Sequence, residues 1–509
     1  MKIGILDLLS LPAKSLLDTI YHPIVTKQFA SIMPQIISVW CRQLGHQSFY
    51  ATYYGLGDPQ KLLPDDLDTV FIACCTEMSP LAYALAKRYR QAGVRTVIGG
   101  PHAKSFAKDC LRFFDIVVKE CDKELITNIL TDQFAPGMYI SSSRPLNDLP
   151  TVQEREAEIR HASFYWRRWR NPFLGSTIQT MSSMGCPYTC DFCTDWDTPY
   201  RLLPLDRLAA DFNYIATRFP GAIAAFMEPN FAVKFEQTFA LLEALPPESR
   251  IPYVMECSLS ILNESRIERL QQSGCIAALF GIESWGDYAN KSGLGGRRST
   301  NDKLTKTVAQ FHQLKDKISY IQANFIFGID SDMGDEPVEI TKTFMHETPF
   351  AWPTLNIPSP YGGTPLQQRL LTEGRILEAM PFMFYVTPNL SITLKNYDPR
   401  SYFEKLIELS TFISDDTLLK RRLQATQIKS GRFFHRLRTF GEKYLCQHYR
   451  QTLTRLRSDK QFLDFHEQRS TQLPPYYRHQ FEKKLGKYAS LLSPQERQPQ
   501  LEPTVPLLV

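Results

Sequence analysis

The sequence lacks three features that would define a membrane or secreted protein. No apolar run approaches the ~18–20 residues of a membrane-spanning helix. The first residues, MKIGILDLLSLPAK, are short and interrupted by charge, so they indicate a first strand and not a secretory signal. Without such a signal, the 11 cysteines argue against a disulfide framework. We therefore expect a soluble cytoplasmic protein whose thiols stay reduced.

An excess of charge of one sign is also absent from most of the chain, because positive and negative residues nearly balance there. The net charge is +5, and residues 1–400 carry 39 Lys and Arg against 42 Asp and Glu. From Ser401 on, 19 Lys and Arg stand against 11 Asp and Glu. These basic residues alternate with aromatic and acidic ones, which favours a solvated helical face over a nucleic-acid or membrane surface.

At 509 residues the chain is too long for one compact core, and we expect two to four domains. Residues 1–136 alternate strand and helix patterns, and KIGILDL, TVFIACC and VRTVIGG are three of five strands. This alternation predicts an α/β domain with a doubly wound parallel sheet. Ligands of such sheets bind at the carboxyl ends of the strands.

Prolines, charges and an RRWR run mark residues 137–172 as a linker, after which a second alternation begins. Residues 173–395 contain six strand patterns, from TIQTMSS to PTLNIPSP, with five helix patterns between them. They predict a partial (β/α)6 barrel, with its chemistry at the carboxyl ends of the strands. Residues 396–492 are expected to be helical and basic, and the proline-rich residues 493–509 to be disordered.

Three cysteines in MSSMGCPYTCDFCTDW have the spacing C-x3-C-x2-C, and no fourth follows nearby. A structural zinc site takes four protein ligands, and a short polar loop is an odd place to bury inert thiols. Cysteine thiolates do hold iron-sulfur clusters. Cys186, Cys190 and Cys193 on a four-iron cluster leave one iron open, as catalytic metal sites keep one position free.

This motif, with Phe192 before the last cysteine and a place after the first barrel strand, resembles the radical S-adenosylmethionine superfamily. The resemblance implies a 4Fe-4S cluster held by Cys186, Cys190 and Cys193, which makes them metal ligands and catalytic residues at once. It implies S-adenosylmethionine on the open iron, with Phe192 beside it. One electron from the cluster cleaves the sulfonium and gives a 5′-deoxyadenosyl radical. An electron donor such as a flavodoxin or ferredoxin is then required.

The resemblance also gives cofactor-binding roles to the ends of the barrel strands. Glu228, in MEPNFAV, is expected at the amino group of S-adenosylmethionine. Glu256 and Ser258, in MECSLS, are expected at its ribose or carboxylate. Glu283 and Ser284 end the FGIES strand and are further candidates. For each carboxylate, the alternative is an ion pair at the barrel rim.

A doubly wound domain before the barrel is similar to the cobalamin-binding branch of this superfamily, over about residues 1–395. VIGGPHAKS resembles the segment that approaches the corrin, where Gly99 and Gly100 permit close backbone contact. The Asp-x-His-x-x-Gly motif that offers a histidine to cobalt is missing, and His102 is interpreted first as a loop residue. Cobalt without a histidine suits methyl transfer to a radical, and it suits equally a domain that has lost cobalamin.

Three functions stay open at this point. The first is a radical enzyme that uses cobalamin to methylate an unactivated carbon of an unknown small-molecule or peptide substrate. The second is a radical cyclisation, oxidation or rearrangement without methyl transfer. The third is a non-catalytic iron-sulfur or zinc protein whose basic C-terminal helices bind a partner.

Overall fold

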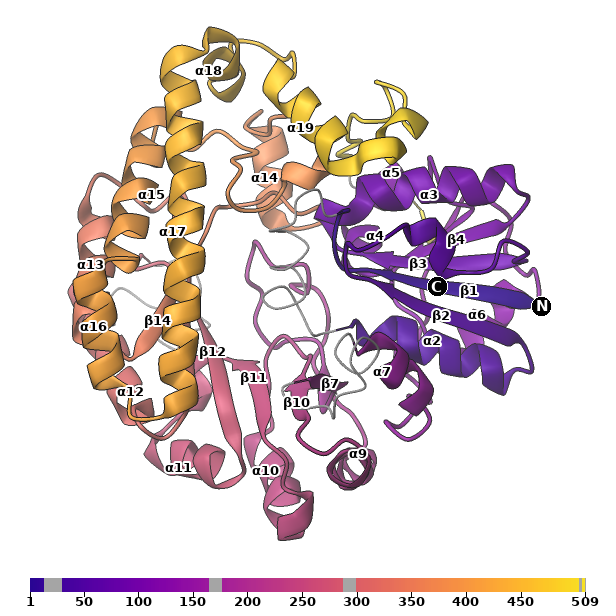
Figure 1. Ribbon diagram of the computed structural model, residues 1–509, viewed down its shortest axis with the longest axis horizontal. Helices are drawn as coiled ribbons and strands as arrows, with labels where there is room; N and C mark the ends of the chain where they lie inside the picture. The colour runs from indigo at the N-terminus through magenta and orange to yellow at the C-terminus, as the bar shows by residue number, and fades with distance from the viewer. Residues whose placement is uncertain (13–29, 164–175, 287–298, 503–505, 509) are drawn as a thin grey trace.

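The N-terminal part of the chain is a parallel sheet between two layers of helices (Figure 1). The computed structural model describes residues 1–12, 30–163, 176–286, 299–502 and 506–508. The strand order is β15-β6-β5-β4-β3-β1-β2, and every pair is parallel. The strands are β1 (Lys2–Leu8), β2 (Gln47–Tyr53), β3 (Thr69–Cys74), β4 (Arg95–Gly99), β5 (Ile116–Val118), β6 (Met138–Ile140) and β15 (Leu507–Leu508).

Alternating apolar side chains of β1 fill a core on each face of this sheet, because successive side chains of a strand point to opposite faces. Ile3 and Ile5 belong to the core under α2 (Ile32–Gln43) and α6 (Lys123–Leu130). Leu6 and Leu8 belong to the core under α3 (Ser79–Gln91), α4 (Pro101–Ser105) and α5 (Ala107–Cys110). The predicted doubly wound sheet is therefore confirmed, with both of its faces buried.

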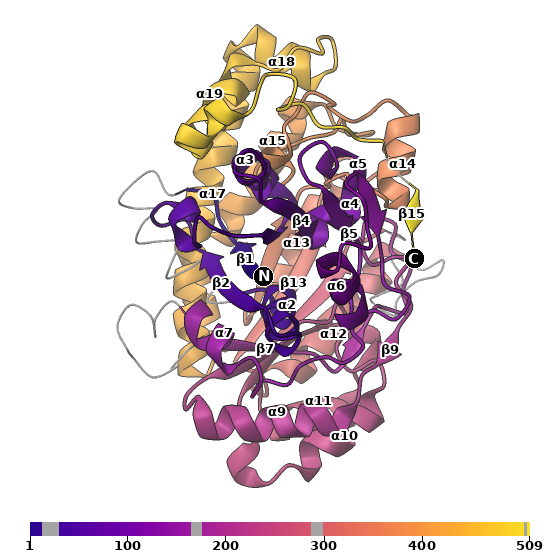
Figure 2. The same ribbon diagram turned by 90° about the vertical axis from the view of Figure 1, so that its right-hand side faces the viewer.

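The central part is a second parallel sheet, in the order β14-β13-β12-β11-β10-β7, which places β14 and β7 at opposite edges. This is the predicted partial barrel with six strands. A helix on the outside of the barrel follows each of the first five strands along the chain (Figure 2). The strands are β7 (Thr177–Thr180), β10 (Ile223–Phe226), β11 (Tyr253–Cys257), β12 (Cys275–Glu283), β13 (Tyr320–Ile326) and β14 (Ala351–Asn356). The helices are α9 (Leu205–Arg218), α10 (Phe235–Ala244), α11 (Glu264–Gln272), α12 (Thr300–Leu314) and α13 (Glu336–Glu347).

The C-terminal part is helical, as predicted, and lies along the β14 side of the barrel (Figure 1). Its helices are α14 (Pro365–Thr372), α15 (Pro399–Ile413), α16 (Asp416–Ala425), α17 (Lys429–Ser458), α18 (Lys460–His466) and α19 (Pro475–Leu485). In the part of the chain that the structure describes, no helix is both long and apolar enough for a membrane span.

A short antiparallel pair, β8 (Ser183–Met184) with β9 (Arg201–Leu202), closes the loop after β7.

The segment predicted to be a linker, 137–172, is largely built into the fold. It contains strand β6 and helix α7 (Glu156–Ala162), while 164–172, with the RRWR run, lies outside the described residues. Arg155 is fully buried, and its guanidinium donates to Gln35 Oε1 and to the Gln179 carbonyl, both at 2.9 Å. Gln35 lies on α2 and Gln179 on β7, so this arginine joins the two sheets. The charged residues of the segment predicted an exposed linker. That prediction was wrong because the charged side chain of Arg155 is buried and hydrogen-bonded.

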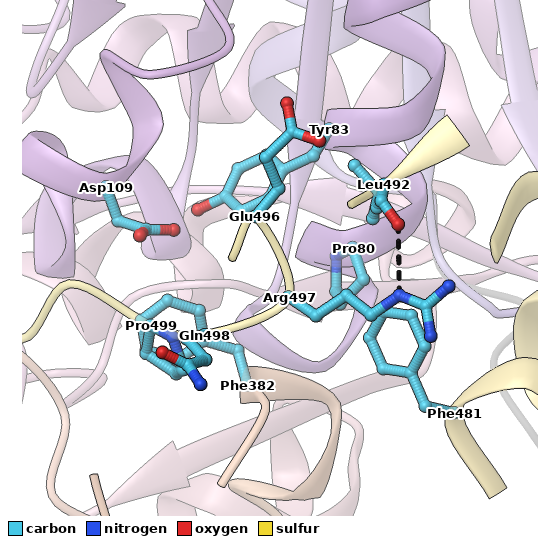
Figure 3. Close-up of a pocket in the computed structure, with 10 residues that line it drawn as sticks. All are labelled: Pro80, Tyr83, Asp109, Phe382, Phe481, Leu492, Glu496, Arg497, Gln498 and Pro499. Carbon is cyan, nitrogen blue, oxygen red and sulfur yellow. Dashed lines mark hydrogen bonds between the residues drawn. The ribbon is translucent and has the colours of Figure 1, made fainter. Parts of the chain in front are cut away.

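The tail predicted to be disordered is also ordered over 493–502 and 506–508. Lys87 forms an ion pair with Glu496 at 2.8 Å, and Gln367 Nε2 donates to the Leu501 carbonyl at 2.8 Å. Figure 3 shows that Leu492 and, from the tail, Glu496, Arg497, Gln498 and Pro499 line a cavity of about 10 Å³ together with Tyr83 and Asp109, and this cavity has room for one water at most. The proline-rich composition misled the prediction because the tail pairs its backbone with other parts of the chain: β15 extends the sheet beside β6.

Deleting residues 493–509 is expected to lower the Tm by at least about 2 °C, since several hydrogen bonds of about 1 kcal/mol each are lost. Glu502→Gln is the matched control: its ion pair with Lys108 is exposed, so the Tm is expected to stay unchanged. Differential scanning fluorimetry measures both. An unchanged Tm for the deletion would show that the tail does not stabilise the fold.

Candidate active site

The three cysteines lie on one loop at the carboxyl end of β7, where barrel chemistry is expected. Cys186 N donates to the Thr198 carbonyl at 3.2 Å, and Cys193 N donates to the Cys190 carbonyl at 3.1 Å. Gly185 precedes the first cysteine with a φ of +68°, and a Cβ there would collide with the Pro199 carbonyl. The backbone thus holds a tight turn, and all three thiols are partly exposed.

Two nitrogen donors already point at these sulfur atoms. Asn230 Nδ2 lies 3.8 Å from Cys186 Sγ, and Asp195 N lies 3.5 Å from Cys193 Sγ. Hydrogen bonds of this kind stabilise thiolates that ligate a cluster. Among the described residues, no three His, Cys, Asp or Glu side chains are arranged to hold a single metal ion. An iron-sulfur cluster does not need that convergence because each thiolate binds a different iron, so the three cysteines fit such a cluster.

Asn230 is a candidate site residue that was not predicted from the sequence, although MEPNFAV contains it. It is fully buried, and its Oδ1 accepts from Ser258 N at 2.9 Å while its Nδ2 faces Cys186. It therefore joins the ends of β10 and β11 to the cysteine loop. A polar residue at a strand end was visible in the sequence, but the bond to Cys186 depends on the fold.

Replacing this donor is expected to lower the reduction potential of the cluster. Asn230→Asp keeps the acceptor for Ser258 N, removes the Nδ2–Sγ bond and brings a carboxylate beside Cys186, so both changes destabilise the reduced state. The lost hydrogen bond of about 1 kcal/mol corresponds by itself to a shift on the order of 40 mV for a one-electron couple, and the carboxylate adds to it. Potentiometric titration followed by EPR measures the shift. Asn213→Asp makes the same change of net charge at an exposed position of α9, and an equal shift there would assign the effect to net charge and not to the position beside Cys186.

Glu228 is a buried carboxyl with an unsatisfied oxygen. It is 2% exposed; its Oε1 accepts from Ser182 N at 3.0 Å and from Ser182 Oγ, and its Oε2 has no hydrogen-bond partner. Burial raises its pKa to about 7, against the lowering effect of the Ser182 bonds. An orphaned buried carboxylate oxygen fits a cationic ligand such as the amino group of S-adenosylmethionine.

A cavity of about 420 Å³ opens inside the barrel and brings together three predicted residues from separate segments: Phe192, Glu256 and Glu283. Glu283 has a φ of +64°, and the pairing of β12 with β13 shifts register between Gly281 and Glu283. A bulge of this kind re-aims a side chain, and strained backbone clusters at functional sites. The cavity has the size of a small-molecule site.

The two predicted serines lie at the site but face different partners. Ser258 is buried, and its hydroxyl bonds Ser260 Oγ at 2.8 Å, next to the Tyr188 hydroxyl of the cysteine loop. Ser284 donates to Asp332 Oδ1 at 3.2 Å, and neither serine lines the cavity. Their hydroxyls thus support the strand ends. Their contact with a cofactor stays a prediction.

The carboxyl edges of the two sheets face each other across the cysteine loop. Lys104, just after β4, donates to Asp195 Oδ1 at 2.7 Å and Thr198 Oγ1 at 2.9 Å. Gly362, in the segment after β14, packs so tightly against the Ser105 carbonyl that a Cβ would collide with it. Tyr361 lines the barrel cavity and also lies near the end of β3, where Glu77 adds to the burial that raises its pKa to about 12. A ligand at the edge of the first sheet would therefore lie close to the barrel mouth.

Gly99 and Gly100 lie at this edge, at the end of β4. Gly100 has a φ of +92°, which favours glycine by itself, and nothing lies within 3.8 Å of a Cβ built on Gly99. The open backbone at Gly99 fits a flat ligand, whereas Gly100 serves the turn. His102 is fully buried, its Nε2 bonds the Tyr83 hydroxyl at 2.6 Å, and burial lowers its pKa to about 3. Its ring is a core residue and not a free ligand for cobalt.

Two relatives were found by sequence comparison, whereas no protein-family model matches the chain. A bacteriochlorophyllide d C-8(2)-methyltransferase of Chlorobaculum tepidum is 23% identical over 359 residues, which cover 67% of this chain and 77% of the relative. An uncharacterized methyltransferase of Pyrococcus horikoshii is 22% identical over 357 residues, which cover 65% of this chain and 75% of the relative.

Solved structures of similar fold were also found. The cobalamin-dependent S-adenosylmethionine radical enzyme OxsB, with aqua-cobalamin bound, matches with a TM-score of 0.55 and 10% identity, over 96% of this chain and 84% of that one. The radical S-adenosylmethionine methyltransferase TsrM of Kitasatospora setae, with cobalamin and a 4Fe-4S cluster bound, matches with a TM-score of 0.51 and 14% identity, over 73% of this chain and 78% of that one. The resemblance predicted from the cysteine motif and the domain order is thereby confirmed at the level of the fold.

Proposed function

We propose that this chain is a cobalamin-dependent radical S-adenosylmethionine enzyme that methylates an unactivated carbon of a small molecule. One observation carries the proposal: the loop with Cys186, Cys190 and Cys193 lies between the carboxyl edge of the first sheet and the mouth of the barrel. That place brings a cluster, S-adenosylmethionine and a corrin within reach of one cavity. The methyltransferase names of both sequence relatives support methyl transfer.

The chain's own residues would bind and orient the cofactors. When bound, the cluster supplies one electron for sulfonium cleavage, and cobalamin supplies a transferable methyl group. Cys186, Cys190 and Cys193 hold the cluster, and Asn230 tunes it through Cys186. Glu228 offers its free Oε2 to the amino group of S-adenosylmethionine. The protein positions the reacting groups inside a walled cavity, where effective concentration is high.

Product analysis on the reconstituted, cobalamin-loaded protein tests the proposal. With S-adenosylmethionine and a flavodoxin or ferredoxin as electron donor, we expect 5′-deoxyadenosine together with S-adenosylhomocysteine. S-adenosylhomocysteine should disappear when cobalamin is left out. Formation of 5′-deoxyadenosine alone, with cobalamin bound, would contradict methyl transfer and would support the second function below.

A radical cyclisation, oxidation or rearrangement is the second candidate. The observation in its favour is the match to OxsB, which covers 96% of this chain and is named a cobalamin-dependent S-adenosylmethionine radical enzyme. In this case the same cysteines, cavity and edge of the first sheet serve different chemistry, because a fold does not fix a reaction.

A further inference from the structure

A chain of hydrogen bonds runs along the inner wall of the barrel and begins at the C-terminal helix α17. Arg438 Nη2 donates to Gln322 Oε1 and to Thr354 Oγ1, both at 3.0 Å. The Tyr320 hydroxyl also donates to Gln322 Oε1, at 2.9 Å, and Gln322 Nε2 donates to Asn324 Oδ1 at 2.7 Å. Gln322, Asn324 and Thr354 line the 420 Å³ cavity.

Arg438 fixes the direction in which these hydrogen bonds run. A guanidinium has only donors, so Gln322 must turn its oxygen to Arg438 and its amide nitrogen to Asn324. Asn324 must then turn its oxygen to Gln322, which leaves its Nδ2 as the group that faces the cavity. No described residue accepts a hydrogen bond from Asn324 Nδ2, and Asn324 is partly exposed. Thr354 is set in the same way: its oxygen accepts from Arg438, so its hydroxyl proton is free to donate.

The neighbouring strands give the cavity the reverse character, because Glu256 on β11 and Glu283 on β12 also line it. Donors therefore line the β13–β14 wall, and carboxylates line the β11–β12 wall. Arg438 itself is held in place by the ring of Trp352 on β14, 5.6 Å from its guanidinium carbon. Figure 1 shows how this is possible: α17 runs beside β14, along the edge of the barrel sheet.

We propose that the β13–β14 wall binds a carboxylate or carbonyl oxygen of the substrate through Asn324 Nδ2 and the Thr354 hydroxyl. Arg438 acts as a positioning residue, since it sets the direction of these donors without lining the cavity. This proposal rests on the proposed function for the site, and it adds a substrate class: molecules that carry an oxygen acceptor for the β13–β14 wall. It also gives the C-terminal helices a role in substrate selection.

A matched pair of small ligands tests the wall directly. We would titrate 3-phenylpropionate and 3-phenylpropylamine into the reconstituted holoenzyme with S-adenosylmethionine present, by saturation-transfer difference NMR. The ratio of the two affinities in the wild-type protein is the reference, because the donors of the β13–β14 wall favour the carboxylate while Glu256 and Glu283 favour the amine. Asn324→Asp keeps the acceptor for Gln322 Nε2 and removes the donor, so the preference should fall by at least about tenfold.

Arg438 is tested by substitutions that leave the cavity lining intact. Arg438→Met should weaken the carboxylate preference severalfold, because Gln322 and Asn324 are then free to turn, and Arg438→Lys should restore part of it. Arg436→Met removes the same charge from an exposed position of α17 and should change nothing. Unchanged preference in both Asn324→Asp and Arg438→Met would overturn the proposal. So would equal losses in Arg438→Met and Arg436→Met, which would point to net charge.

Other measurements test the proposed function separately from the proposal about the β13–β14 wall. Iron and sulfide content and the Kd for S-adenosylmethionine are recorded for each variant, and both are expected to match the wild type. If Asn324→Asp weakens S-adenosylmethionine binding while the ligand preference stays, the wall belongs to that cofactor and the proposal is wrong. Loss of the cluster in the wild-type protein would instead contradict the proposed function, whatever the ligand preference.

Discussion

Replacing Cys186, Cys190 and Cys193 with alanine is expected to remove iron and sulfide together and to abolish 5′-deoxyadenosine formation. Anaerobic reconstitution of the wild type is expected to give about four irons and four sulfides per chain, as a 4Fe-4S cluster requires. Each single replacement should already lower the iron and sulfide content strongly. The loop supplies only three thiolates and the fourth iron has no protein ligand, so the cluster has none to spare. Colorimetric iron and sulfide assays and the EPR signal of the reduced protein measure the loss.

Cys257→Ala is the matched control for the triple variant. Cys257 ends β11 near the site, but it is buried and has no ligand spacing. The variant should keep the full cluster. Iron that survives in the triple variant, or zinc without sulfide in the wild type, would contradict the cluster and support the non-catalytic metal protein.

The second large effect concerns Glu228 and the affinity for S-adenosylmethionine. The ionised carboxylate binds the amino cation, and burial raises the pKa of Glu228 to about 7. The ionised fraction therefore grows as the pH rises through 7, so binding should tighten about tenfold per pH unit below 7 and level off above it. Removing the charge in Glu228→Gln should weaken binding about 10- to 100-fold and remove the pH step.

Equilibrium dialysis of the anaerobic holoenzyme between pH 6 and 7.5 measures this dependence. Glu256→Gln serves as the control: this carboxyl lines the cavity and is exposed, so the variant should keep the pH step even if its affinity changes. A wild-type Kd that stays constant over the range, or a step that persists in Glu228→Gln, would show that another group controls the binding.

The same pKa predicts the pH dependence of stability without ligand. A carboxyl whose folded pKa lies above its usual value binds more protons in the folded state between about pH 4.5 and 7. The contribution of Glu228 to the free energy of unfolding is therefore present at low pH and is lost as the pH rises toward 7. Bound S-adenosylmethionine would oppose this loss, because its cation stabilises the ionised form.

Local pattern was sufficient for the elements and for the cysteine loop. Alternating apolar runs such as KIGILDL and YVMEC specify buried strands, and C-x3-C-x2-C places three cysteines on one loop, because spacing along the chain sets these features directly. The same holds for the strand ends at Glu228, Glu256 and Glu283, since parallel strands end at one edge. The predicted linker and disordered tail failed because composition does not show that Gln35 will pair with a buried Arg155 or that β6 will pair with β15.

What the sequence by itself determined is thus the two parallel sheets, the first before the second along the chain, and a loop with three cysteines after the first barrel strand, because each depends on residues near one another in the chain. Only the tertiary structure decided that the edges of both sheets face the cysteine loop through Lys104 and Gly362. It alone placed Asn230 on Cys186 and Arg438 behind Asn324, across 44 residues in the first pair and more than a hundred in the second. Such contacts depend on packing between distant segments, and no local spacing encodes that.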